Sequence, residues 1–160
     1  MKINVTTTPL EKVRAQALVI LHEEGGALAL PSHAPLRRHV DAFVRDVEAK
    51  KSKAEWFCTL GKDAKCAAPH LLLDSATFGV YTPHDEPLKI AAARAVALCR
   101  KHSLSDIAFA VDHETAALKA AAILEGAMLG DFVDDRFKGD GKKKQTPLVL
   151  TFVVSRKAEK

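Results

Sequence analysis

The 160-residue chain lacks the features that define several protein classes. Its three cysteines (Cys58, Cys66 and Cys99) are odd in number and form no C-x-x-C pair, which disfavours a disulfide framework or a zinc ribbon. No apolar run approaches the ~18 residues of a membrane span, and the amino-terminal residues lack the apolar core of a signal peptide. Aromatic residues make up 6% of the chain, with one Trp and one Tyr. We therefore expect a soluble, cytoplasmic domain with no membrane contact.

The chain has only a small excess of positive charge, because 24 basic and 20 acidic residues give a net charge of +4. This balance permits an anionic partner without requiring one. Positive charge is concentrated around the predicted loop Gly139–Pro147. Its lysines can contact phosphates, but no aromatic side chains are interleaved to stack on bases, so a solvated loop is the alternative. The candidate nucleic-acid contacts are Lys138, Lys142, Lys143 and Lys144.

The sequence does contain alternating strand-like and helix-like patterns. Short apolar or alternating runs predict strands at Lys2–Thr6, Ala17–Leu21, Trp56–Leu60, Leu71–Asp74, Phe78–Tyr81, Ile107–Val111 and Leu148–Val154. Apolar residues at helical spacing predict helices over Ser32–Lys50, Pro87–His102 and Glu114–Leu129. Ser32 is the expected N-cap of the first helix. Strands that alternate with helices predict one α/β domain over residues 1–160, with helix, sheet and helix in three layers. A hairpin around Trp56–Asp74 makes the sheet mixed.

Nucleophiles and metal ligands form no catalytic pattern. Cys58 and Cys99 lie in apolar patterns and are expected to be core thiols, whereas Cys66 lies near two lysines and is the most plausible reactive thiol. The seven histidines are scattered and show neither H-E-x-x-H nor ligand spacing from a cysteine. Most of them are expected in loops or at helix ends. The seven are His22, His33, His39, His70, His84, His102 and His113.

The carboxylates and glycines form no recognisable catalytic or metal-binding motif either. Asp131, Asp134 and Asp135 could hold a hard cation, but they lack the spacing of a calcium loop. Arg136 and Lys138 beside them favour surface ion pairs instead. Gly126 and Gly130 are four residues apart near a predicted helix end, which favours close helix packing. The residues therefore predict no catalytic site and no metal site in this chain.

The most distinctive segment, Glu125–Lys138, has the sequence EGAMLGDFVDDRFK. It resembles the end of the N-terminal domain of leucyl aminopeptidases, where a helix ends in E-G-x-x-L-x-x-Y-x-F-D-x-Y-K. Phe132 and Phe137 stand where that family commonly has tyrosines. Further segments resemble the family in the same order: Ala17–Leu21, Lys89–Val96, Ser105–Val111 and Leu148–Val154. Leu71–Gly79 departs from it, since the family usually has a G-L-G turn there.

The resemblance implies a fold similar to macro domains and a non-catalytic role in assembly, access or regulation. The family removes N-terminal residues, often leucine, from peptides with two divalent metals, commonly zinc or manganese, that activate a water. That machinery lies in a separate catalytic domain, whose signature N-T-D-A-E-G-R is absent here, so no catalytic residue and no cofactor is carried over. The implied partners are the catalytic domain and further copies in a hexamer, with peptide substrates bound by the whole enzyme.

Two other functions remain open. The implied fold, with Gly25-Gly26 after a buried strand, is compatible with a stand-alone macro-like module that binds ADP-ribose or a related nucleotide. The net positive charge and the lysine loop are compatible with a DNA-binding accessory domain.

Overall fold

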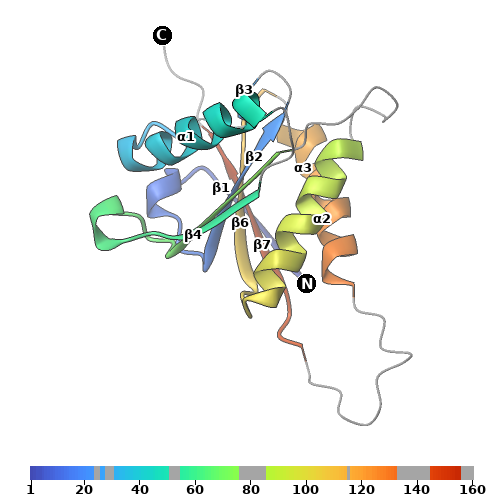
Figure 1. Ribbon diagram of the computed structural model, residues 1–160. Helices are drawn as coiled ribbons and strands as arrows, with labels where there is room; N and C mark the ends of the chain where they lie inside the picture. The colour runs from blue at the N-terminus through green and yellow to red at the C-terminus, as the bar shows by residue number, and fades with distance from the viewer. Residues whose placement is uncertain are drawn as a thin grey trace.

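Parallel strands form the centre of the molecule (Figure 1). The computed structural model describes residues 1–23, 26–27, 31–50, 55–75, 86–114, 116–132 and 145–155. In these residues, seven strands form one sheet of order β1-β7-β6-β2-β5-β4, with β3 paired to β2. The strands are β1 (Lys2–Thr6), β2 (Ala17–Glu23), β3 (Gly26–Ala27), β4 (Glu55–Thr59), β5 (His70–Ser75), β6 (Asp106–Val111) and β7 (Val149–Val154). The predicted strand Phe78–Tyr81 lies outside the described residues.

The sheet is mixed, as predicted. Strands β1, β7, β6, β2 and β5 are parallel, whereas β4 pairs antiparallel with β5 and closes one edge. In the predicted hairpin, Trp56 lies opposite Leu73 and Cys58 lies opposite Leu71. The first six residues of β2 are all buried, because this central strand is covered on both faces.

Helices cover both faces of the sheet and complete the predicted three layers (Figure 1). The helices are α1 (Ala34–Lys50), α2 (Glu86–Lys101) and α3 (Ala116–Asp131), with short 3-10 turns η1 (Leu10–Lys12) and η2 (Lys62–Ala64). Val19 and Leu21 of β2 pack in the core under α2 and α3. Leu18 and Ile20 point to the other face, where they pack with Phe43 of α1. Among the described residues, no helix combines the length and apolarity needed to cross a bilayer.

Helix α1 begins one residue later than the predicted N-cap implies. Its first helical hydrogen bond runs from the Arg37 backbone N–H to the His33 carbonyl at 2.9 Å. His33 is therefore the N-cap, and the prediction of Ser32 is wrong by one residue. The reason is a long-range contact: Nε2 of His33 lies 2.6 Å from the Ala64 carbonyl oxygen. This bond fixes the start of the helix against η2, and so overrides the local preference for serine.

Helices α2 and α3 approach each other closely at two glycines, as the spacing of Gly126 and Gly130 predicted. A Cβ on Gly126 would lie 2.1 Å from the Lys89 carbonyl oxygen, and one on Gly130 would lie 2.3 Å from that of Ala93. Both distances are far below any real contact, so only glycine permits this helix pair. Helix α3 begins at Ala116 and continues to Asp131, two residues beyond its predicted end.

Candidate functional site

The carboxyl ends of the five parallel strands share one edge of the sheet. Open α/β sheets bind ligands at this edge, between two neighbouring strands whose connections run to opposite sides of the sheet. Here β2 and β6 are neighbours, but β2 leads to α1, β4 and β5 on one side, whereas β6 leads to α3 and β7 on the other. The boundary between β2 and β6 is therefore the topological switch point, and its residues are the first candidates for function.

Three charged side chains form one cluster at this switch point. Nζ of Lys119 on α3 lies 3.0 Å from a carboxylate oxygen of Glu23, the last residue of β2. It also lies 3.4 Å from Oδ2 of Asp112, which directly follows β6. Burial lowers the pKa of Lys119, but its hydrogen bonds and charge interactions with the two carboxylates outweigh this and raise it. The cluster therefore connects helix α3 to the ends of β2 and β6.

A second charge pair lies at the end of β5. The Asp74 side chain is 1% exposed. Arg94 on α2 binds it through two hydrogen bonds, Nε to Oδ2 at 3.1 Å and Nη2 to Oδ1 at 2.9 Å. The same Nη2 also donates to the Ser75 carbonyl at 2.9 Å. This geometry holds the carboxylate in place and links helix α2 to the sheet.

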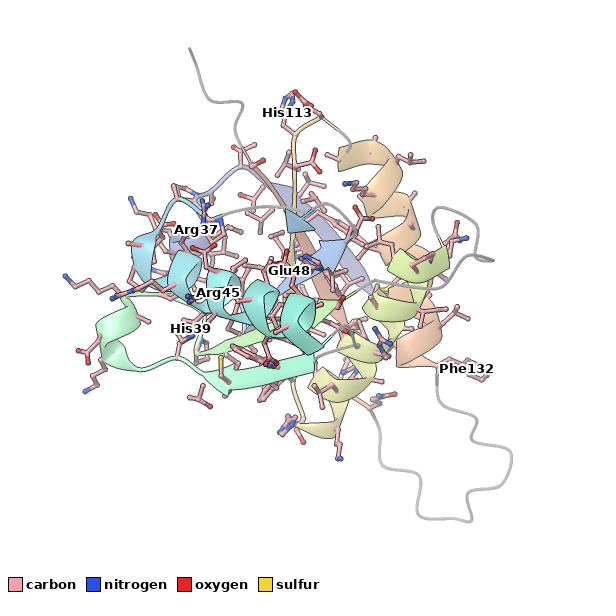
Figure 2. The ribbon with its side chains drawn as sticks, turned by 45° about the horizontal axis from the view of Figure 1, so that its top comes forward. Arg37, His39, Arg45, Glu48, His113 and Phe132 are labelled. Atoms are coloured by element: carbon pink, nitrogen blue, oxygen red, sulfur yellow. The ribbon has the colours of Figure 1, made fainter. Side chains whose placement is uncertain are left out.

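His22, on the α1 face of β2, is a buried histidine with an unsatisfied nitrogen. It is 6% exposed, and its ring meets Phe43 edge-on at 6.5 Å between centroids. Its Nδ1 atom has no hydrogen-bond partner among the described residues. Burial lowers the pKa of His22, and the nearby carboxylates Glu48 and Glu23 offset only part of this effect. Figure 2 shows Glu48 on α1. His22 thus differs from the loop or helix-end position expected of most histidines.

We expect stability to fall in acid because of His22. Its folded pKa lies below the unfolded value of 6.5, so the unfolded chain binds more protons between these two values. The contribution of neutral His22 to the free energy of unfolding is complete above pH 6.5. It is lost as the pH falls from 6.5 through the folded pKa. Between these two pKa values the loss is about 1.4 kcal/mol for each pH unit. Urea unfolding from pH 7.5 to pH 5 should show a flatter profile for His22→Leu. The matched control is His113→Gln, in the exposed turn after β6 (Figure 2), and it should keep the wild-type slope of the free energy of unfolding against pH. Equal slopes for the wild type and His22→Leu would contradict this account.

A small cleft opens beside the carboxyl ends of β1 and β7. Its volume is about 370 Å³, and it is lined by residues 7–11, 31–32 and 153–155. The polar side chains on its wall are hydroxyls, together with the Glu11 carboxylate. Thr8 N–H donates to Oγ1 of Thr6 at 3.1 Å, which fixes the loop that follows β1. Such a lining fits a small uncharged polar molecule better than an anion.

The four lysines predicted as nucleic-acid contacts lie outside the described residues: Lys138, Lys142, Lys143 and Lys144. Asp134, Asp135 and Arg136 lie there too. Asp131 is described, and its partner is Arg100 on α2, with Nε 2.6 Å from Oδ1. Arg100 also donates to the Thr146 carbonyl at 2.9 Å, so it links both helices to the approach to β7. The described residues include no group of three or more His, Cys, Asp or Glu side chains placed to hold a metal ion.

Cys99 is buried, whereas Cys58 and Cys66 are partly buried. Burial raises the pKa of Cys58, and it raises the pKa of Cys99 to about 12. Burial also raises the pKa of Cys66, and Glu11 adds to this effect, while a backbone hydrogen bond from Ala68 opposes it. A raised pKa leaves less reactive thiolate. Burial thus raises the pKa of all three thiols, and the prediction that Cys66 is the most reactive of them stays a prediction.

Sequence reasoning missed the two charge clusters and the buried histidine. One signal was present, since Asp74 and Asp112 each follow a run of apolar strand residues and so mark strand ends. The cations that pair with these two carboxylates could not be identified from the sequence. Lys119 and Arg94 belong to helices whose contacts with those strand ends depend on the three-dimensional fold.

The fold is similar to solved proteins of two kinds. It matches a mutant of tomato leucine aminopeptidase over 96% of this chain, with a TM-score of 0.64 and 18% identity, and spans 32% of that protein. It also matches the macrodomain of Thermus aquaticus DarG over 94% of this chain and 97% of that one, with a TM-score of 0.55 and 11% identity. The sequence matches no family model and no curated protein. At these identities the likeness establishes a macrodomain-like α/β fold.

Proposed function

We propose that this domain is the non-catalytic N-terminal domain of a metal-dependent leucyl aminopeptidase and acts in assembly, access or regulation. The observation that carries the proposal is the match of nearly the whole chain to about a third of tomato leucine aminopeptidase, at a higher TM-score than the macrodomain gives. The resemblance of the segment Glu125–Lys138 to the same family supports it independently. Because the chain spans only that third, the aminopeptidase activity would belong to the remainder of the protein.

The ion pairs at the carboxyl edge of the sheet fit a structural role for these charged side chains. At the switch point, Lys119 is engaged by Glu23 and Asp112, and at the end of β5 Arg94 is engaged by Asp74. Under this proposal the zinc or manganese pair of the family belongs to the catalytic domain. The implied partners are a catalytic domain and further copies of the protein in a hexamer.

The second candidate is a stand-alone module that binds ADP-ribose or a related nucleotide. The observation that favours it is the coverage of 97% of a macrodomain by this chain. The switch point weighs against it, because a diphosphate is usually bound by backbone N–H groups and cations. The cation at that position, Lys119, is already engaged by Glu23 and Asp112. A DNA-binding accessory role is the third candidate, and it depends on the lysines of residues 138–144.

A turnover assay, a calorimetric titration and a gel-retardation experiment on the purified 160-residue chain separate these functions. We expect no release of leucine from leucine amide with Mn²⁺ or Zn²⁺ added, and no heat on titration with ADP-ribose. Metal-dependent turnover would overturn the non-catalytic assignment. Saturable heat with ADP-ribose would instead establish the nucleotide-binding module. Retardation of a DNA duplex that weakens steeply with salt would favour the DNA-binding role.

A further inference from the structure

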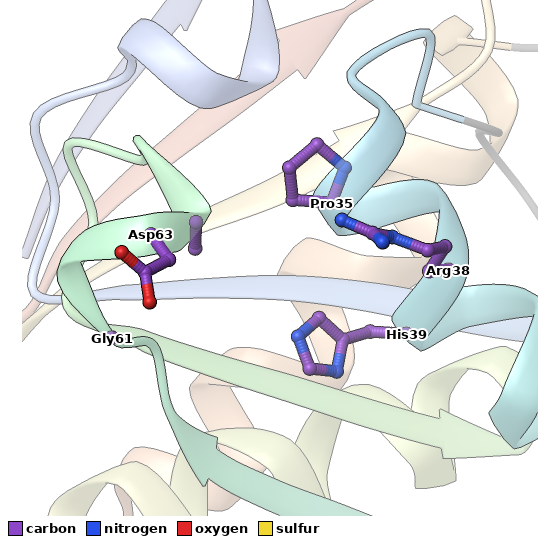
Figure 3. A pocket seen from close by; sticks show the side chains of 6 residues that line it. Pro35, Arg38, His39, Gly61 and Asp63 are labelled. Atoms are coloured by element: carbon purple, nitrogen blue, oxygen red, sulfur yellow. The ribbon is translucent and has the colours of Figure 1, made fainter.

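A pocket of about 430 Å³ lies between the start of α1 and the connection from β4 to β5 (Figure 3). Its volume falls within the roughly 300–1,000 Å³ of small-molecule sites. The residues around it are Pro35, Arg38, His39, Gly61, Asp63 and Ala64. None of them belongs to the charge clusters at the ends of β2, β5 and β6, so the pocket is a separate feature of the surface.

The two walls of this pocket differ in charge. Figure 3 shows Arg38 and His39 on the wall formed by α1, and Asp63 on the facing wall formed by η2. Pro35 and Ala64 contribute apolar surface between them. A cation on one wall and a carboxylate on the other fit a molecule that has both charges itself.

These two charges are not used within the described part of the chain. Arg37, the preceding residue of α1, donates from Nε to Oδ1 of Asp41 at 3.1 Å. Arg45 of the same helix donates to the Asp41 backbone carbonyl at 3.3 Å. In contrast, no hydrogen bond or ion pair to another described residue engages Arg38 or Asp63, so both are available to a ligand.

The walls are held in position before any ligand binds. Nε2 of His33, the N-cap of α1, lies 2.6 Å from the Ala64 carbonyl oxygen, which connects the two walls directly. Within η2, the Ala64 N–H donates to the Gly61 carbonyl at 3.0 Å and the Lys65 N–H donates to that of Lys62 at 3.1 Å. A fixed pocket loses less conformational entropy when it binds a small molecule.

We propose that this pocket binds the zwitterion of a free α-amino acid with an aliphatic side chain. The Arg38 guanidinium binds the α-carboxylate, and the Asp63 carboxylate binds the α-ammonium group. His39 contributes a ring nitrogen beside the carboxylate, and the aliphatic side chain lies against Pro35 and Ala64. The proposal rests on the chemistry of this pocket alone and is independent of the function proposed above. Because both charged groups are exposed, we expect a dissociation constant in the millimolar range.

The test is an NMR titration of ¹⁵N-labelled protein with L-leucine, followed by backbone shifts around residues 33–39 and 61–65. We expect saturable shifts in both segments. Arg38→Gln and Asp63→Asn should each weaken binding about tenfold, since each leaves one charge of the ligand without its partner. The matched control is Arg37→Gln, because Arg37 lies beside Arg38 but binds Asp41 outside the pocket, and it should bind as the wild type does.

Two analogues test the need for both charges. N-acetyl-L-leucine lacks the ammonium group and L-leucinamide lacks the carboxylate, so each should bind about tenfold more weakly than L-leucine. Equal binding of N-acetyl-L-leucine would overturn the proposal in favour of a simple anion site. Equal loss of affinity in Arg37→Gln and Arg38→Gln, or no saturable shifts with L-leucine, would overturn it as well.

Discussion

Arg94→Ala should lower the free energy of unfolding by about 3 kcal/mol. The substitution removes two hydrogen bonds to Asp74 and one to the Ser75 carbonyl, and it takes the Arg94 cation away from a carboxylate that is 1% exposed. A buried carboxylate that loses a bidentate cation keeps the cost of its desolvation but loses much of what offset it. Because the Arg94 side chain is itself 30% exposed, water compensates part of the loss, and the expected value lies at the lower end for such pairs. Urea unfolding at pH 7 measures it.

Arg37→Ala is the matched control for this prediction. It breaks an ion pair with Asp41 in which both side chains are about half exposed, at 46% and 50%. Such pairs contribute less than about 1 kcal/mol. Since both variants remove one arginine and one ion pair, a clear difference between them isolates the effect of burial. Equal losses in the two variants would show that the Asp74–Arg94 pair does not hold α2 against the sheet.

Gly126→Ala should destabilise the domain by about 2–3 kcal/mol, although alanine is the better helix former by about 1 kcal/mol. The new Cβ would lie 2.1 Å from the Lys89 carbonyl oxygen and 2.9 Å from the Ala92 Cβ, so α2 and α3 must move apart. The atom that blocks it belongs to the helix backbone, which cannot give way as a flexible side chain can. Thermal or urea unfolding, with circular dichroism as the readout, measures the loss.

Gly61→Ala serves as the control, because a Cβ at this position meets nothing within 4 Å. The Gly61 backbone has φ −72° and ψ 168°, a conformation that alanine adopts without strain. We expect this variant to be as stable as the wild type or slightly more so, since it reduces the freedom of the unfolded chain. Wild-type stability in Gly126→Ala would contradict the close approach of the two helices.

Most of the fold could be predicted because its elements are determined by local apolar patterns. Buried runs such as Ile107–Val111 identify the central strands, and the spacing of Leu36, Val40, Phe43 and Val47 identifies α1. The two glycines of α3 also identified a close helix contact correctly. The errors arose where a distant contact prevailed over a local preference. Ser32 is a good capping residue, but the bond between His33 and Ala64 moved the helix start.

Less of the site was predictable, because its charges come together only in the folded chain. Asp74 and Arg94 are 20 residues apart, and Lys119, which pairs with Glu23, lies on a helix much later in the sequence. Similarly, Arg38 and Asp63 face one pocket because η2 folds back against α1. The partial burial of Cys66 also depends on the fold, whereas the two lysines near it are visible in the sequence.

The most direct measurement is the sequence of the source gene beyond the codon for Lys160. If this domain serves a leucyl aminopeptidase, the reading frame should continue into a catalytic domain that contains N-T-D-A-E-G-R and its metal-binding lysine and aspartates. A stop codon directly after Lys160 would contradict this function. The domain would then act by itself, and ligand or nucleic-acid binding would become its leading function.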